Sequence, residues 1–211
     1  MKKLALIFFL LVVSAWNWPT HQEFAMKVYD SFPEETKSHF NLTLVKEGAI
    51  IPDKVFQDYE YHSYPGSVEK TDLWLKRSVE AYQNVEYDAA SIALGIATHY
   101  MSDSFAAPHA VHGEEYSQHA KFEKEAEGVP FLAKCAVGEK DAEQYLSKGQ
   151  LSEKDWGFWL RKKDLLIQSR ELSNALEAGY ALSHAYYEKE CYQSLGSRLT
   201  GFFVMLKFRF S

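Results

Sequence analysis

At 211 residues the chain has the length of a single domain and is long enough to bury a full hydrophobic core without cross-links. Its 46% hydrophobic and 25% charged residues are ordinary for a globular protein. The formal net charge of −6 gives no overall attraction to nucleic acid or to an anionic membrane, although a metal-filled cleft can still be locally positive.

Residues 1–15 have the pattern of a secretory signal peptide. Two lysines begin the segment, ten apolar residues follow, and Val13-Ser14-Ala15 is a small-residue cleavage site. Ten apolar residues are too few to span a bilayer as a helix, so a permanent anchor is the weaker interpretation. We therefore expect cleavage after Ala15, a mature domain over residues 16–211, and a secreted or extracytoplasmic location.

The mature part is expected to form helices in succession. Thr20 is a suitable N-cap for a helix over residues 21–31, and a second helix is expected over residues 33–45. Residues 48–66 are rich in Tyr, Pro and Gly, so we expect a long loop there, and such loops are usually functional. Further helices are expected over residues 70–83, 89–105 with Asp88 as cap, 117–127 with Ser117 as cap, 139–146 and 154–191.

No run of strand-like alternation occurs anywhere in the chain, which predicts an all-α fold, a single-domain multi-helix bundle. Residues 199–211 are apolar with two basic residues, and either a terminal core helix or a weak membrane-surface contact would suit them, the core helix being favoured. Core positions expected in the last long helix are Trp156, Phe158, Trp159, Leu165, Leu166, Leu172, Leu176, Tyr180 and Leu182.

The segment from His99 to Glu123 contains two pairs of residues that suit a metal ion. His99 with Asp103 and His119 with Glu123 are spaced four apart, so each pair lies on one face of a helix. A single such pair is more often a hydrogen bond, but two pairs and His109 between them favour metal. Because His99 and Asp103 share the apolar face of their helix, the carboxylate is expected to be buried and to need a charged partner. Nitrogen and oxygen ligands at these spacings suit Zn²⁺.

Three more ligands are expected from the N-terminal half. Asp53 and His62 lie in the long loop, and His21 lies in the first turn of the first helix. Cleavage after Ala15 would also free the amino group of Trp16, which with its own carbonyl can chelate a metal. The plainer interpretation of Trp16 is that it only marks the cleavage point.

The two cysteines, Cys135 and Cys191, are too few to define a disulfide scaffold. They can form one disulfide in an oxidising compartment or remain unbonded, and the sequence leaves both alternatives open. Neither has a second cysteine or a histidine at motif spacing, so we expect neither to bind zinc or to act as a nucleophile.

With these ligands assembled, the sequence resembles the zinc-dependent phospholipase C family, whose wider superfamily includes fungal single-strand-specific nucleases. The motif is an N-terminal Trp after a signal, an early His, a looped Asp…His, then His-x-x-x-Asp-x5-His and a closing His-x-x-x-Glu. The positions are filled in order by Trp16, His21, Asp53, His62, His99, Asp103, His109, His119 and Glu123. The resemblance covers residues 16–123 and implies an all-helical bundle with three zinc ions at the base of a cleft.

The resemblance also implies a ligand set for each zinc ion. The first zinc would be held by Asp53, His62, His99 and Asp103, and the second by His109, His119 and Glu123. The third would be held by the Trp16 amine and carbonyl, His21 and a bridging Asp103. The intervals between Asp53 and His62 and between His109 and His119 are shorter than in the well-known secreted enzymes, so head-group specificity does not carry over.

The expected reaction is hydrolysis of a phosphodiester by in-line attack of zinc-bound hydroxide, which removes a phospholipid head group. Asp53 is the expected catalytic residue, which orients the attacking water or accepts its proton. We expect a monomer that contacts the membrane surface only transiently.

Two alternatives remain. One is a single-strand nuclease or 3′-nucleotidase on the same zinc site, although these nucleases close the second site with Asp where this chain has Glu123. The other is a non-catalytic exported protein with structural zinc, whose coordination would be closed where catalytic zinc keeps an open position.

Overall fold

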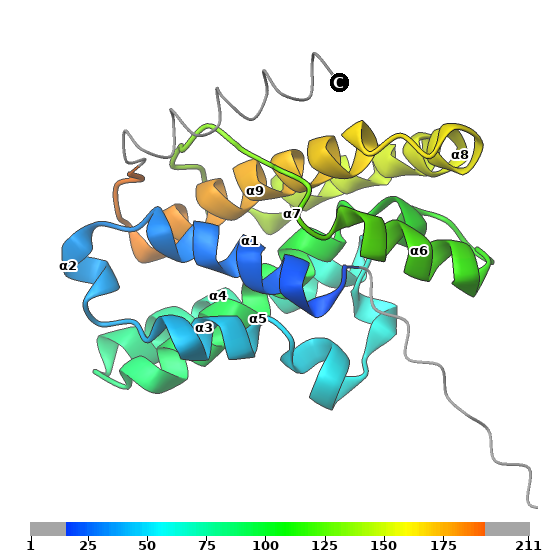
Figure 1. Ribbon diagram of the computed structural model, residues 1–211. Helices are drawn as coiled ribbons and strands as arrows, with labels where there is room; N and C mark the ends of the chain where they lie inside the picture. Colours follow the sequence, from blue (N-terminus) through cyan, green and yellow to red (C-terminus); the bar gives the residue numbers. More distant parts are fainter. Residues whose placement is uncertain (1–15, 193–211) are drawn as a thin grey trace, which may run out of the picture.

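The computed structural model describes residues 16–192, so the predictions for residues 1–15 and 199–211 lie outside the described residues. Over this range the all-α prediction is confirmed, because the chain forms helices and turns and no strand (Figure 1). The α-helices are α1 (Trp18–Asp30), α2 (Glu34–Lys37), α3 (Leu42–Gly48), α4 (Gly66–Gln83), α5 (Tyr87–Asp103), α6 (Tyr116–Ala126), α7 (Ala142–Leu146), α8 (Ser152–Lys162) and α9 (Leu166–Tyr187).

The first helix starts earlier than the sequence predicted. Asn17, not Thr20, is the N-cap of α1, and its side chain accepts a hydrogen bond from the Thr20 N–H at 3.2 Å. Pro19 fits here because the first turn of a helix has no N–H ladder to interrupt. The extra turn leaves the chemistry unchanged, because His21 still lies on the buried side of α1.

Two of the predicted caps are also wrong. Helix α5 begins at Tyr87 with Glu86 at the N-cap, so Asp88 lies within the first turn, where its charge complements the helix dipole. Helix α6 begins at Tyr116 with Glu115 at the N-cap, so Ser117 is already helical, and its hydroxyl donates to the Glu115 carboxylate at 2.6 Å. Both differences amount to one or two residues at helix ends.

Two predicted long helices are each divided in two. The helix predicted over residues 33–45 splits at Asn41, whose side chain caps α3 by accepting from Thr43 N at 3.1 Å. The helix predicted over residues 154–191 breaks between α8 and α9, where Lys163 has a left-handed φ of 52°. Neither Gly nor Pro lies at the second break, so the sequence contains no residue that would have predicted the end of a helix there.

The second break exposes part of the predicted core. Phe158, Leu165 and Leu166 are 43%, 37% and 57% exposed, so their assignment to the core is wrong. Because α8 turns away from α9 at Lys163, the apolar stripes of the two helices do not continue into one another. Trp156, Trp159, Leu172, Leu176, Tyr180 and Leu182 are buried as predicted.

The predicted loop over residues 48–66 contains short helical turns. A π-helical turn, η1 (Pro52–Phe56), and a 3-10 turn, η2 (Tyr59–Tyr61), connect α3 to α4. Asp53 lies in η1 and His62 directly follows η2, and both side chains are fully buried. The segment is therefore ordered by the core beneath it and directs two polar side chains inward.

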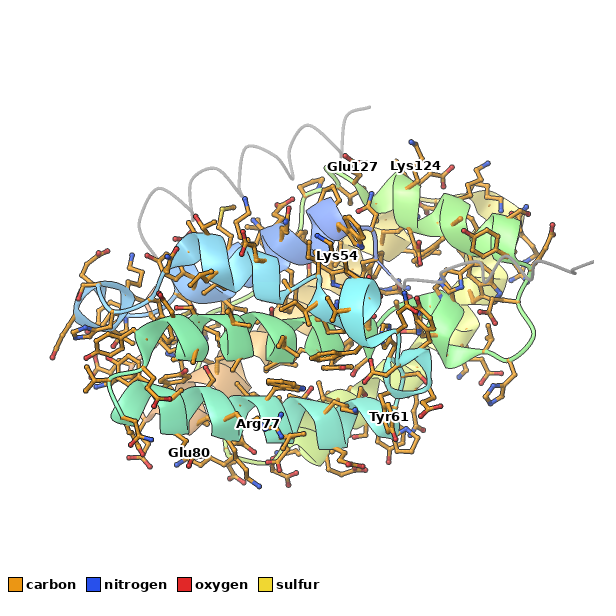
Figure 2. The ribbon with its side chains drawn as sticks, turned by 90° about the horizontal axis from the view of Figure 1, so that it is seen from below. Lys54, Tyr61, Arg77, Glu80, Lys124 and Glu127 are labelled. Carbon is orange, nitrogen blue, oxygen red and sulfur yellow. A yellow bond between two sulfur atoms is a disulfide. The ribbon has the colours of Figure 1, made fainter. Side chains whose placement is uncertain are left out.

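Helix α5 is the central helix of the bundle. It packs against α4, α3, α1 and α9, and nearly all of its residues after Ala90 are buried. Helix α4 lies alongside it and directs charged side chains such as Arg77 and Glu80 outward (Figure 2). A ligand carried by the second half of α5 is therefore held deep in the protein.

Helices α3 and α5 approach each other so closely that only glycine fits between them. A Cβ atom on Gly95 would lie 2.1 Å from the Val45 carbonyl oxygen, and one on Gly48 would lie 2.3 Å from the Ile92 carbonyl oxygen. This approach brings the carbonyl group of Ala49, at the end of α3, against α5.

The two cysteines are joined. Cys135 and Cys191 form a disulfide that links the extended segment before α7 to the residues after α9. The alternative of unbonded cysteines is thereby excluded for this structure. Among the helices of residues 16–192, none combines the length and the apolar character that crossing a bilayer requires.

Candidate metal centre

The structure brings the predicted ligand side chains together from six parts of the chain. Helix α1 supplies one, η1 and the end of η2 one each, α5 two, the turn η3 (Ala107–Ala110) one and α6 two. Their ligand atoms form three groups, in each of which the atoms lie within 4.8 Å of one another. The groups are His21, His99 and Asp103; Asp53, His62 and His99; and His109, His119 and Glu123.

Asp103 is surrounded by three imidazoles. Its Oδ2 atom lies 2.9 Å from His62 Nδ1 and 3.1 Å from His99 Nε2, and its Oδ1 atom lies 3.4 Å from His21 Nε2. Asp103 and the three histidines are all almost fully buried. A carboxylate that contacts three rings through its two oxygens can bridge neighbouring cations. His99 belongs to both of the first two groups.

The third group lies at the junction of η3 and α6. His119 Nε2 is 2.7 Å from Glu123 Oε1, and the ring centroids of His109 and His119 are 5.1 Å apart. The His109 ring also stacks on the ring of His62 at 5.9 Å, so this group adjoins the second one. The structure therefore holds one continuous cluster.

Hydrogen bonds on the outer side fix the orientation of two of the imidazoles. His99 Nδ1 lies 2.9 Å from the Ala49 carbonyl oxygen, which only accepts, so Nδ1 carries the proton and the Nε2 lone pair faces the cluster. The Ser102 hydroxyl donates to the His99 carbonyl oxygen at 2.9 Å, so it accepts from His21 Nδ1 at 3.0 Å. His21 Nε2 is thereby left for a ligand.

Two acidic residues that the sequence reasoning missed orient two further rings. Glu114 Oε1 lies 3.1 Å from His119 Nδ1, and Asp58 Oδ1 lies 3.6 Å from His62 Nε2. Asp58 also accepts from the Tyr100 hydroxyl and from Lys70 Nζ at 2.9 Å. The i,i+4 spacing of Asp58 and His62 was a usable signal, whereas Glu114 precedes α6 and has no such spacing.

The residues present fit a metal ion. His21 Nε2 and His109 Nε2 are buried, and neither has a hydrogen-bond partner among the described residues. A polar atom in that state costs free energy unless it is coordinated. The set of imidazoles and carboxylates is the one that zinc uses in proteins.

The protonation states agree with this assignment for two of the rings. Burial lowers the pKa of His109 to about 3 and lowers the pKa of His21 well below its ordinary value, so both rings are neutral. Burial raises the pKa of Glu123 to about 7. Neutral imidazole is the form that binds metal.

His62 behaves differently because carboxylates surround it. Burial disfavours its charged form, but the close contact with Asp103 and the nearby carboxylates of Asp58 and Asp53 raise its pKa to about 9. The ring is therefore protonated at neutral pH in the metal-free protein, and a cation binding there must displace that proton.

Trp16 lies beside the cluster. Its indole Nε1 donates to the Ser102 carbonyl oxygen at 3.0 Å, and its ring packs against Phe122 at 5.4 Å. Ser102 also holds His21, so the first residue of the expected mature chain and the α1 ligand are fixed to the same point of α5.

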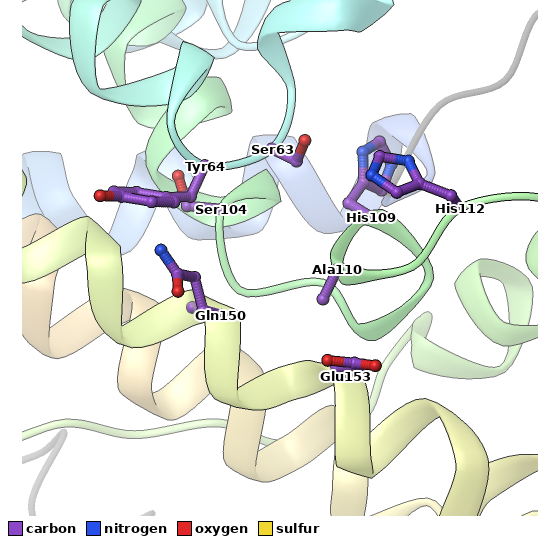
Figure 3. Close-up of a pocket in the computed structure, with 9 residues that line it drawn as sticks. Ser63, Tyr64, Ser104, His109, Ala110, His112, Gln150 and Glu153 are labelled. Atoms are coloured by element: carbon purple, nitrogen blue, oxygen red, sulfur yellow. The ribbon is translucent and has the colours of Figure 1, made fainter.

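A small polar pocket adjoins the third group. Its volume is about 200 Å³, and His109 forms part of its wall (Figure 3). The remaining lining residues are Ser63, Tyr64, Ser104, Ala110, His112, Gly149, Gln150 and Glu153. Hydroxyl, amide, imidazole and carboxyl groups dominate the wall, so the pocket suits a small hydrophilic group and not an acyl chain.

Over the described residues, the fold and this cluster define an all-helical protein with a candidate metal centre built from His, Asp and Glu side chains. Comparison with models of protein families matches residues 20–180 to the family described as zinc dependent phospholipase C. The chain belongs to this family and is a phospholipase C-type zinc hydrolase. Neither the curated proteins nor the solved structures contain a match to the chain.

Proposed function

We propose that this protein hydrolyses the phosphodiester bond of a phospholipid and releases the phosphorylated head group from diacylglycerol. The observation that carries the proposal is the polar pocket whose wall includes His109. A phosphate held at the cluster would have its small hydrophilic substituent within reach of that pocket, while the acyl chains remain outside in the lipid surface.

We further propose three zinc ions. Asp53, His62, His99 and Asp103 would hold the first, and His109, His119 and Glu123 the second. His21 and Asp103 would hold the third together with the amine and carbonyl of Trp16. The contact between Trp16 and Ser102 supports this set, because Ser102 also hydrogen-bonds to His21.

Zinc, when bound, would activate a water molecule and neutralise the negative charge on the phosphoryl oxygens. Asp53 is our proposed proton acceptor. Its Oδ1 atom lies 3.6 Å from His99 Nε2 and 3.7 Å from His62 Nδ1, so its carboxylate faces the interior of the cluster. The outer hydrogen bonds of His21, His99 and His119 keep the ring nitrogens directed to the same place.

We also propose that the protein is exported, cleaved after Ala15, monomeric, and in contact with membranes only transiently. The Cys135–Cys191 disulfide supports export, because such bonds persist in oxidising compartments.

The test is an assay of the exported, zinc-loaded protein on a phosphatidylcholine analogue and on single-stranded DNA. We expect head-group release, loss of activity with a chelator, and recovery with zinc. Activity on DNA alone would make the protein a nuclease, and zinc without an exchangeable water would make it a structural zinc protein. N-terminal sequencing with metal counting is expected to show a start at Trp16 and about three zinc ions per chain.

A further inference from the structure

Glu171 is a buried carboxyl group outside the metal cluster. It lies in α9, and only 1% of its surface is exposed. Burial raises the pKa of its carboxyl well above the ordinary value, so the group is neutral. A neutral acid in a helix core is less stabilising than a leucine there unless it makes a specific bond.

That bond goes to the turn between two ligand-bearing elements. Glu171 Oε2 accepts from the backbone N–H of Ala107 at 3.1 Å. Ala107 begins η3, which carries His109, and the turn before it starts where α5 ends at Asp103. The side chain therefore reaches the backbone that joins the ligands of α5 to the ligand of η3.

The backbone of this turn explains why a side chain is needed. The N–H groups of Phe105, Ala106 and His109 donate to carbonyl oxygens three residues earlier. The N–H of Ala107 bonds instead to Glu171. The first N–H groups of any helical turn have no partner within it, and a buried one must find an acceptor elsewhere.

Two further contacts hold the same turn. The Ser152 hydroxyl, at the start of α8, donates to the Phe105 carbonyl oxygen at 2.9 Å. A Cβ atom at Gly149 would lie 1.7 Å from the Ser104 carbonyl oxygen, so only glycine permits the approach. The turn is thus fixed from one side by Gly149, Ser152 and Glu171, none of which belongs to the proposed ligand groups.

We propose that Glu171 is a positioning residue that anchors the amide of Ala107 and so keeps His109 aligned with His119 and Glu123. The inference rests on the proposed function only in that His109 is taken as a zinc ligand. It assigns to α9 a role in metal binding that no ligand motif indicates.

Two substitutions separate the bond from the packing. Glu171→Gln is neutral and nearly isosteric and retains a carbonyl acceptor, so we expect wild-type behaviour. Glu171→Leu fills a similar volume without an acceptor. We expect it to lower zinc affinity at the His109 group by about 10- to 100-fold, the range for loss of an outer-shell partner. Ser152→Ala weakens the same turn and should shift zinc affinity in the same direction by less.

The matched control is Tyr187→Phe, which removes a buried hydroxyl from the far end of α9. That hydroxyl contacts Ser78 Oγ at 2.5 Å. The control should reduce thermal stability without changing zinc affinity. If the effect of Glu171→Leu came from a general weakening of α9, zinc affinity would fall in Tyr187→Phe as well.

A second measurement does not depend on zinc. Hydrogen exchange of the Ala107 amide in the metal-free protein should accelerate in Glu171→Leu and remain slow in Glu171→Gln. Unchanged exchange or unchanged zinc affinity in Glu171→Leu, or an equal loss in Glu171→Gln, would overturn the proposal. A wild-type protein that binds no zinc would refute the proposed function, whereas the exchange result would still decide whether Glu171 holds the amide.

Discussion

The Nε2 atom of His99 lies 3.1 Å from Oδ2 of Asp103, one helical turn further along α5, and both side chains are fully buried. The sequence spacing predicted this relationship. The structure adds that Asp103 serves His62 and His21 as well, so a single carboxylate connects ligands from three parts of the chain.

Replacing the Asp103 carboxylate should remove much of the capacity of the cluster to bind metal. We expect Asp103→Asn to bind at least one zinc ion fewer per chain and to lose about a hundredfold or more of the hydrolytic rate, because a neutral amide is a weaker ligand. Metal analysis and the head-group assay measure the two effects. Asp88→Asn, in the exposed first turn of the same helix, is the control, and full zinc content in Asp103→Asn would contradict the expectation.

Ser102 offers a test of ring orientation. Ser102→Ala removes the acceptor for His21 Nδ1 and leaves that ring free to rotate or change tautomer, so zinc affinity should fall by about 10- to 100-fold. Zinc titration against a competing chelator measures it. Thr98→Val is the matched control, because it removes a buried hydroxyl of α5 whose one bond within residues 16–192 is to the Gly95 carbonyl oxygen. Equal losses in both variants would show a general effect on α5.

The pocket should distinguish head groups by charge. Among the described residues, Glu153 is the one carboxylate of its lining and neither Lys nor Arg lines it, so a head group with a positive charge should be preferred over a neutral one. Glu153→Gln should reduce that preference by about two- to fivefold, the range for an exposed ion pair. The ratio of kcat/KM for phosphatidylcholine and phosphatidylglycerol measures it.

The control for this selectivity is Glu80→Gln, which makes the same change of charge on the outer face of α4 (Figure 2). The ratio should be unaffected by it. If Glu153→Gln also leaves the ratio of kcat/KM unchanged, the pocket does not distinguish head groups by their charge.

His184 predicts a pH dependence of stability that is independent of metal. Its Nε2 atom lies 2.8 Å from Ser31 Oγ in the core, and burial lowers its pKa to about 4. The unfolded state takes up a proton near pH 6.5 and the folded state only near pH 4. Stability is therefore lost as pH falls through this window, by up to about 3 kcal/mol.

Denaturant unfolding of the metal-free protein at several pH values tests this prediction. The free energy of unfolding of His184→Gln should fall less between pH 7 and pH 4 than that of the wild type. Parallel curves for the two proteins would exclude His184 as the source.

The grouping of the candidate ligands was predictable from the sequence because these residues lie at fixed intervals within or beside helices. His99, Asp103, His119 and Glu123 follow the helical repeat, and the structure brings them to one cluster. Their outer partners were not predictable, because the Ala49 carbonyl and Glu114 come from elements whose packing no periodicity records.

Helix breaks were the main error in the fold. Lys163 adopts a left-handed conformation without being glycine, and the sequence therefore suggested one continuous helix where there are two. The break is stabilised locally, since the Asp164 carboxylate accepts from Leu166 N at 3.0 Å and starts α9. The N-terminal part of α8, at the other end of that helix, contributes Ser152 and Glu153 to the turn and the pocket.

The contact between Gly48 and Gly95 sets the spacing of α3 and α5, and the Ala49 carbonyl that orients His99 lies at the end of α3. A methyl group at either glycine would push the two helices apart and withdraw that carbonyl from the imidazole. A homologue that kept every coordinating residue but carried alanine at position 95 would consequently hold its metal poorly. Counting homologues that merely retain the coordinating residues would therefore overestimate how many of them are active.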